Sequence, residues 1–271
     1  MTEINLTGRE IIAKAIEFGA SLAGIVNIDE LKFSPSHTIY GKMPDYSGVG
    51  TVDVEGKEKQ GQVQWDNRAR SAVVIAVAHP EDEPDLDYWV QGLSGGTRGN
   101  AKLISVFSRL AGWVEKEKNI GAIKIPYYVE QGGVFVKDAA VLAGLGCIGR
   151  NNILVTPEYG PRVRLRVLFL AADLPSTGIK NYDPCGNCEQ FCKKACPMGA
   201  MGRTVYTAEK MGQDLLPGRN GTYNRKQCNR QMEKDINNGE DVPVPGTDKT
   251  GSEVRFCRQC ELACPVGLND K

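Results

Sequence analysis

The sequence has no net charge, only two histidines and no long apolar run. Its 33 Lys and Arg residues balance 33 Asp and Glu residues, so no overall charge draws the chain toward nucleic acid or an anionic membrane. The longest apolar stretches, 72–78 and 167–172, fall far short of the roughly 20 residues of a membrane helix. Residues 1–6 resemble neither a secretory signal nor a twin-arginine motif. We therefore expect a cytoplasmic protein without a membrane partner.

Cysteine, in contrast, is abundant and unevenly placed. Of nine cysteines, Cys147 alone precedes residue 185, and the other eight lie between Cys185 and Cys264. In a reducing compartment this content indicates metal binding rather than disulfides. The change in composition predicts a boundary near residues 174–178 and two domains, residues 1–175 and 176–271.

The first domain mixes helical and strand patterns. Apolar residues at helical spacing predict helices over residues 8–20, capped by Thr7, and over 101–114 and 134–145. Apolar or alternating runs predict strands over 72–78, 124–129 and 162–167, the second weakened by Pro126. Residues 29–66 follow no sustained period and predict a long irregular segment, which is often functional.

Three arginines alternate with apolar residues in the last predicted strand. Arg162, Arg164 and Arg166 should share one strand face, because side chains repeat every second residue. That face is either exposed to solvent, as charged residues usually are, or it binds anions or amides.

Two cysteine motifs carry the clearest chemical signal. Each has closely spaced cysteines and ends in Cys-Pro, the first at Cys196-Pro197 and the second at Cys264-Pro265. Bacterial iron–sulfur runs share this ending, and their last Cys binds the other cluster. With Cys228 there are eight thiols, the number that two 4Fe–4S clusters require.

The crossover predicts which thiols bind together. The expected ligands of one cluster are Cys185, Cys188, Cys192 and Cys264, and those of the other are Cys196, Cys228, Cys257 and Cys260. Three residues separate Cys188 from Cys192 where the common run has two, so this assignment stays open. Structural zinc is the alternative, but zinc sites close at four ligands and rarely use this repeat.

A G-x-G-x-x-G pattern stands at Gly144, Gly146 and Gly149. A dinucleotide fingerprint follows a strand and opens a helix, whereas this pattern follows a predicted helix. Nicotinamide binding is therefore not favoured.

The residues from Glu130 to Asn151, with Glu158-Tyr159-Gly160 and the two cysteine motifs, resemble the cobalamin-dependent epoxyqueuosine reductases and, more distantly, the reductive dehalogenases. The pattern at Ala143–Asn151 is fairly specific when it precedes a double cluster domain. The resemblance implies an α+β fold, with a nitroreductase-like cobalamin-binding core followed by a ferredoxin-like domain that holds two 4Fe–4S clusters.

The resemblance also implies site residues. Glu130 stands where the family has an acidic residue proposed to protonate the substrate, with Glu in place of the usual Asp, and Tyr159 is a rival donor together with Tyr127 and Tyr128. Solvent exposure for Glu130 and core packing for the tyrosines are the alternatives. The expected cofactor-binding residues are Gly132, Gly133, Lys137, Gly144, Gly146, Cys147, Gly149 and Asn151.

Two of those residues depart from the family. Lys137 stands where it tends to have Arg, and Cys147 stands where it tends to have Trp, so the wall of the pocket differs. Cys147 is either a small buried residue at a turn or a contact of the corrin. Neither His37 nor His79 lies in a cobalt-ligating Asp-x-His-x-x-Gly motif, so we expect base-off cobalamin without a His ligand.

These features predict a reductase that passes single electrons from the clusters to a corrinoid. We expect a small-molecule substrate and a low-potential electron donor such as ferredoxin or flavodoxin. A tRNA substrate is unlikely by this interpretation, because the chain stops soon after the second motif and has no net charge. The alternatives are a non-catalytic protein that reduces or stores a corrinoid for a partner corrinoid protein, and a ferredoxin-type module that binds no corrinoid.

Overall fold

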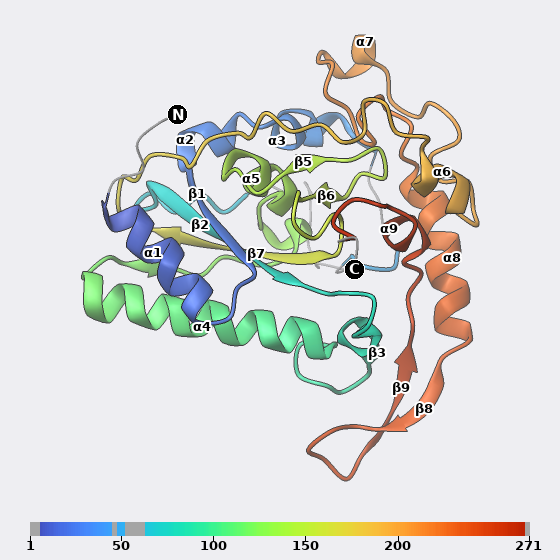
Figure 1. The fold of residues 1–271 in the computed structure, drawn as a ribbon, viewed down its shortest axis with the longest axis horizontal. Coiled ribbons are helices and arrows are strands. Elements are labelled where there is room, and N and C mark those ends of the chain that lie inside the picture. The colour runs from blue at the N-terminus through green and yellow to red at the C-terminus, as the bar shows by residue number, and fades with distance from the viewer. Residues whose placement is uncertain (1–5, 45–47, 52–62, 269–271) are drawn as a thin grey trace.

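A four-stranded antiparallel sheet lies at the centre of the structure, a computed structural model that describes residues 6–44, 48–51 and 63–268 (Figure 1). The strand order is β1 (Leu22–Asn27), β2 (Ser71–Ala78), β7 (Val163–Leu170) and β4 (Ala122–Ile123). Val74 of β2 is paired with Val167 of β7 and with Gly24 of β1. The predicted strands at 72–78 and 162–167 are therefore confirmed.

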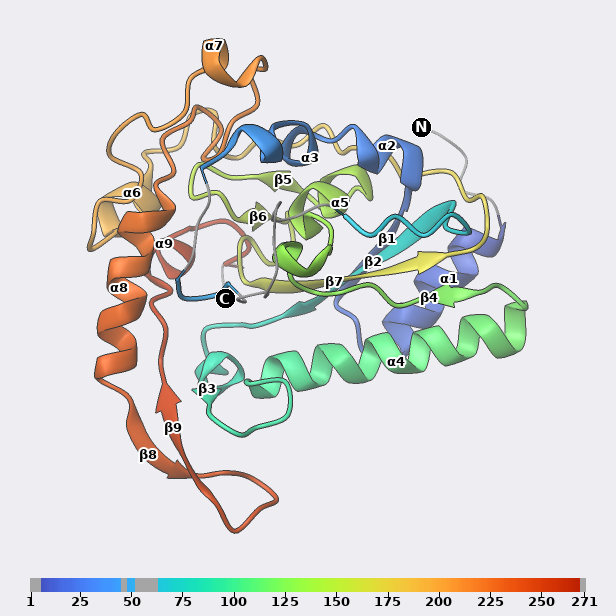
Figure 2. The ribbon, with the colours of Figure 1, turned by 180° about the vertical axis from the view of Figure 1, so that it is seen from behind.

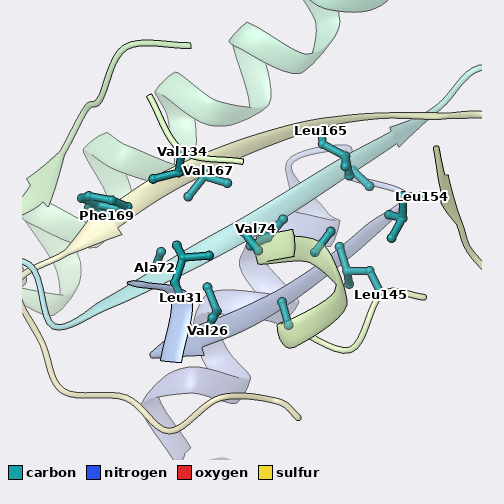
Figure 3. Close-up of a cluster of buried hydrophobic side chains, with 14 of the residues drawn as sticks. Val26, Leu31, Ala72, Val74, Val134, Leu145, Leu154, Leu165, Val167 and Phe169 are labelled. Atoms are coloured by element: carbon teal, nitrogen blue, oxygen red, sulfur yellow. The ribbon is translucent and has the colours of Figure 1, made fainter. Parts of the chain in front are cut away.

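Helices cover both faces of this sheet. The long helix α4 (Arg98–Lys118) packs with α1 (Leu6–Glu17) on one face, and α5 (Val136–Leu142) packs with α2 (Ile28–Lys32) on the other. Alternate residues of β2 explain the two layers, because Val73 and Ile75 face α4 whereas Ala72 and Val74 face α5. Figure 3 shows the second layer, where Val167 lies beside Val134 and Val74 is seen between Val167 and Leu145.

Several predicted elements differ from the structure. Thr7 is the second residue of α1 and not its cap, and α5 is shorter than the helix predicted over 134–145. No strand forms over 124–129, where Pro126 has no N–H to donate to a ladder, and the strand β4 ends just before this range at Ile123. A short 3₁₀ helix, η3 (Val129–Gln131), follows instead.

The segment 29–66 is also less irregular than predicted. It contains most of α2, together with α3 (Pro35–Ile39) and the 3₁₀ turn η1 (Tyr40–Lys42). Pro35 suits the first turn of α3, where its missing N–H is no loss. Residues 45–47 and 52–62 lie outside the described residues, so the prediction is not tested there.

The C-terminal part is built from short elements around one longer helix. They are α6 (Phe191–Ala195), α7 (Ala208–Met211), α8 (Arg225–Asn237), β8 (Glu240–Pro243), β9 (Thr250–Val254) and α9 (Gln259–Leu262). Four small elements precede them in the first part: η2 (Pro84–Asp87), β3 (Trp89–Val90), β5 (Cys147–Ile148) and β6 (Leu154–Val155). Because β3 pairs with β9, residues of the first part complete the C-terminal sheet.

The residues of the predicted boundary run beside the edge strand β1. Thr177 donates its backbone N–H to the carbonyl of Ile25 at 2.9 Å, and Ser176 Oγ accepts the N–H of Asn27 at 2.8 Å. The division at residue 175 stays a prediction. The mixture of helices and an antiparallel sheet agrees with the predicted α+β class. Within the described part of the chain, no helix has the length and apolarity to cross a membrane.

Candidate functional site

Four thiols form a first group, defined by the electrostatic interactions between them. Cys192 interacts with Cys185, Cys264 and Cys188, and Cys264 interacts with Cys185 and Cys188. Burial, together with the smaller effect of the neighbouring thiols, raises the pKa of Cys192 to about 11. These are the four cysteines that the crossover pattern places on one cluster.

The other four cysteines form a second thiol group. Cys260 interacts with Cys228, Cys257 and Cys196, and burial is the largest cause of its raised pKa. Cys257 interacts with Cys228 and Cys196 in the same way. The helix α8 supplies Cys228, and the turn of α9 supplies Cys260.

Both groups are spaced more widely than the ligands of one metal ion. Among the described residues, no three Cys, His, Asp or Glu side chains lie close enough together to hold a single ion. Thiolates on zinc lie about 2.3 Å from the metal, whereas the thiolates of an iron–sulfur cluster surround a larger body of iron and sulfide. The thiols are unpaired, so each group can offer sulfur ligands.

The arginine face of β7 holds the second cysteine motif. Arg162 is buried and donates to the backbone carbonyls of Glu261 at 3.2 Å and Cys264 at 3.0 Å, and also to that of Val266. Arg166 lies farther along the strand, with its guanidinium 5.3 Å from the ring centre of Phe107. The solvent-exposed interpretation is therefore wrong for Arg162, whose guanidinium binds backbone carbonyls of the chain itself.

Arg164 belongs to a buried network of charges beside this motif. Its guanidinium lies 3.1 Å from Glu261 Oε2 and 2.7 Å from Asp87 Oδ1. Arg258 Nε donates to Glu261 Oε1 at 3.1 Å, and Arg258 also pairs with Asp87 at 2.6 Å. Burial alone would raise the pKa of Asp87, but the hydrogen bond from His79 and the charges of both arginines lower it. The network joins the first half of the chain to the α9 turn.

A large cavity lies between α3, α5, η3 and the start of α8, with a volume of about 1490 Å³. Its aromatic lining comprises His37, Tyr40, Trp65, Tyr127, Tyr128, Phe135, Tyr206 and Tyr223. Its basic lining comprises Lys32, Lys137, Arg219, Arg225 and Lys226. The cavity exceeds the roughly 300–1,000 Å³ of pockets for drug-sized ligands, so it has room for a larger, flat molecule.

The predicted proton donors and the predicted cofactor-binding Lys137 differ in their relation to this cavity. Glu130 lines it from η3, and Lys137 lines it from the first turn of α5. Burial lowers the pKa of Lys137 to about 8, and its ammonium donates to the carbonyl of Asn152 at 2.5 Å. Tyr159 is not among the lining residues and packs against the core beside α5, whereas Tyr127 and Tyr128 line the cavity.

The predicted cofactor-binding glycines make close contacts with backbone. A Cβ on Gly146 would lie 2.1 Å from the carbonyl oxygen of Val155, and one on Gly133 would lie 2.4 Å from that of Pro126. Gly132 ends η3 with a positive φ, and Gly144 and Gly149 also pack closely. None of Gly132, Gly133, Gly144, Gly146 and Gly149 is among the lining residues. Chain packing therefore explains why Gly133 and Gly146 lack a side chain, and the cofactor-binding role of the five glycines stays a prediction.

Cys147 connects the cavity to the first thiol group. Its side chain lines the cavity and interacts with the thiols of Cys185 and Cys264, and burial raises its pKa to about 11. The next residues contact both motifs, because Arg150 donates to the carbonyl of Cys185 at 3.1 Å and Asn151 to that of Cys260 at 3.4 Å. The second thiol group also has a neighbour among the cavity residues. This neighbour is Tyr223, whose phenol is hydrogen-bonded to Cys228.

The two histidines are both engaged. His37 lines the cavity, but its Nδ1 lies 2.7 Å from Ser34 Oγ and its Nε2 accepts the N–H of Phe135 at 3.3 Å. Burial lowers the pKa of His37, and the charge of Asp138 opposes this shift. His79 is fully buried, bonds to Asp87 and is not among the lining residues.

Sequence reasoning missed several cavity residues. Trp65 and Tyr223 have no motif around them, and Phe135 was passed over although it lies between Glu130 and Asn151. Arg219 and Arg225 come from the C-terminal part, which was interpreted only through its cysteines. The one available signal was the position of Tyr223, five residues before Cys228.

Comparison with known proteins shows that the chain is similar in sequence to epoxyqueuosine reductases. No family model matches the chain. Epoxyqueuosine reductase of Listeria monocytogenes is 26% identical over 213 residues, which cover 71% of this chain and 52% of that protein. The enzyme of Bacillus anthracis is 23% identical over 266 residues, or 95% of this chain and 63% of that protein. The chain spans 28–52% of the length of the first three such relatives.

The fold of the chain is also similar to solved structures of an epoxyqueuosine reductase and a reductive dehalogenase. A reductive dehalogenase described in terms of B12-dependent dehalogenation has a TM-score of 0.58 and 18% identity, with 100% of this chain and 34% of that one covered. An epoxyqueuosine reductase with an epoxyqueuosine-modified tRNA stem loop has a TM-score of 0.61 and 19% identity, with 98% and 66% covered. The resemblance noted in the sequence is confirmed, and the fold is shared. The tRNA complex of that neighbour conflicts with the expectation that tRNA is an unlikely partner.

Proposed function

We propose that this chain is a cobalamin-dependent iron–sulfur reductase, in which two 4Fe–4S clusters pass electrons to a corrinoid for the reduction of a small substrate. One observation carries the proposal: Cys147 lines the large cavity and at the same time interacts with Cys185 and Cys264 of the first thiol group. A redox ligand in the cavity would therefore lie beside the clusters.

The thiols and the cavity residues fit the iron–sulfur clusters and the corrinoid that we propose. Eight thiols in two sets of four match the ligands of two 4Fe–4S clusters, which transfer single electrons when bound. The cavity is large and its lining is mostly apolar, as a site for a macrocycle should be. Both nitrogens of His37 have partners, which supports a site without a histidine ligand. When bound, a corrinoid supplies low-valent cobalt for reductive bond cleavage.

The residues of the chain supply position, shielding and a proton. Trp65 and Phe135 would exclude water from the aromatic side of the cavity. Their ring centres lie 5.5 and 5.0 Å from the ring centre of His37. Glu130 would donate a proton from its carboxyl group to the substrate, because it lines the same cavity from η3. Lys137 and Cys147 would form the wall that distinguishes this site from its relatives.

The test begins with anaerobic reconstitution using iron, sulfide and hydroxocobalamin, followed by gel filtration, metal analysis and EPR. About eight Fe and one Co per chain, with a base-off Co(II) signal, would support the proposal. About eight Fe without Co would refute the corrinoid assignment and leave an electron-transfer protein.

Turnover separates the enzyme from a corrinoid-reducing or storage protein. Candidate substrates include small organohalides, small epoxides and an epoxyqueuosine-containing tRNA stem loop, so that the RNA is tested directly. With a substrate in hand, Glu130→Gln should reduce turnover at unchanged Fe and Co content. Full turnover by that variant would remove Glu130 from the mechanism.

A further inference from the structure

The outer side of α8 carries a stripe of basic residues. Lys226, Arg230 and Lys234 recur every four residues, which places them on one side of the helix, and all three are exposed. Arg230 donates to the neutral Gln227 at 3.2 Å, and the ammonium of Lys234 lies 3.9 Å from Met198 Sδ. Neither contact neutralises the charge. We call these three residues the α8 stripe.

The other side of the same helix holds the second thiol group. Cys228 belongs to α8, and Asp235 Oδ2 accepts the backbone N–H of Cys257 at 2.8 Å. Met198, which Lys234 contacts, is two residues from Cys196. The α8 stripe is therefore separated from this thiol group by one helix thickness, roughly 10 Å.

The charge of the stripe is local. The whole chain is neutral, yet residues 191–234 contain nine Lys or Arg and three Asp or Glu. Figures 1 and 2 show α8 at the edge of the molecule, beside α6 and α9 and apart from most of α4. A positive patch on a neutral protein attracts and orients an acidic partner.

We propose that an acidic one-electron donor protein of the flavodoxin type docks on the α8 stripe and reduces a cluster held by the second thiol group. The inference rests on the proposed function, because it requires that cluster. The flavin hydroquinone anion loses one electron and becomes the neutral semiquinone, while the cluster changes from the 2+ to the 1+ state. No bond is made or broken.

RNA is the competing occupant of a basic helix. Residues 226–234 contain no aromatic side chain on which a base could stack, and three charges neutralise few phosphates. A protein that must come close to the second thiol group explains both the charge and its position.

The experiment uses the cluster-loaded chain and a photoreduced bacterial flavodoxin. The double variant Arg230→Glu/Lys234→Glu leaves Lys226 intact, because Lys226 also lines the cavity. The control, Lys102→Glu/Lys116→Glu, makes the same charge change at exposed positions of α4. Stopped-flow absorbance gives the rate of cluster reduction at several salt concentrations, and calorimetry gives the Kd for oxidised flavodoxin.

The α8 variant should lose about tenfold or more in both reduction rate and affinity, with a weaker salt dependence. The control should stay within about twofold, and dithionite should bleach all forms equally. Equal behaviour of the two variants would overturn the docking surface. So would a variant that loses affinity for a tRNA stem loop while flavodoxin still reduces it normally. If the wild-type chain binds no iron, the proposed function fails first, and the iron content distinguishes the two failures.

Discussion

Glu261→Gln should destabilise the chain strongly, because Glu261 is the shared partner of two arginines in the buried network. Glu261 is 4% exposed and lies 3.1 Å from both Arg164 Nη2 and Arg258 Nε. At an effective dielectric constant near 20, each such contact is worth roughly 5 kcal/mol before desolvation, which offsets most of it. Removing one member of a buried pair typically costs about 3–5 kcal/mol.

We expect Glu261→Gln to lower the free energy of unfolding by about 3 kcal/mol, the lower end of that range. Glutamine keeps one hydrogen-bond acceptor, and the side chain of Arg164 is 29% exposed. The assay is urea unfolding of the anaerobically reconstituted chain, followed by tryptophan fluorescence at matched iron content. Glu253→Gln is the control, since its pair with Arg255 is at the surface and should contribute less than about 1 kcal/mol. Similar losses for the two variants would show that the network is not buried as described.

Three further predictions concern packing, protonation and ligands. Gly146→Ala should lower the free energy of unfolding in urea by about 2–3 kcal/mol, because the new Cβ would lie 2.1 Å from a carbonyl oxygen. The control Gly112→Ala, at a position on α4 with open space around it, should raise that free energy by about 0.5–1 kcal/mol. Burial lowers the pKa of Lys137 from its ordinary value of 10.5 to about 8 in the folded chain, so the unfolded chain binds more protons between these pH values. The unfolding free energy of the wild type relative to Lys137→Met should therefore rise from pH 8 to 10, and a flat difference would contradict the burial. Cys147→Ala should keep about eight Fe per chain and Cys192→Ala about four, by iron analysis; equal iron loss would make Cys147 a ligand.

The sheet and its main helices could be predicted because their residues repeat with a clear period. Apolar side chains fill both faces of β2, and α4 presents a continuous apolar stripe to the sheet. The elements between residues 28 and 42 were missed because they are too short to show a period. In that stretch, Asp138 fixes the start of α3 by accepting bonds from the N–H and hydroxyl of Ser36, both at 2.7 Å.

The candidate site could be predicted only in part. The two cysteine motifs could be recognised because the spacing within each is local in the sequence, and their division between two clusters stays a prediction. The glycines near residue 146 carried no such information, since close packing against backbone and contact with a ligand both require glycine. The arginines of β7 were ambiguous for a related reason: their partners, Asp87 and Glu261, are about 80 and 100 residues away.

Because these partners are far apart in the sequence, the central sheet and the α9 turn are made at different times during synthesis of the chain. Every strand of the central sheet lies before residue 171, so the sheet is complete on the ribosome while the α9 turn has yet to be made. Until residues 258–266 emerge, Arg162 lacks the carbonyls to which it donates, and Arg164 has Asp87 but lacks Glu261. The strand β3 also lacks its partner β9, which is made just before these residues. The α9 turn thus brings in Cys257, Cys260 and Cys264 together, so under the proposed function neither cluster has its full set of thiols until this turn has been made.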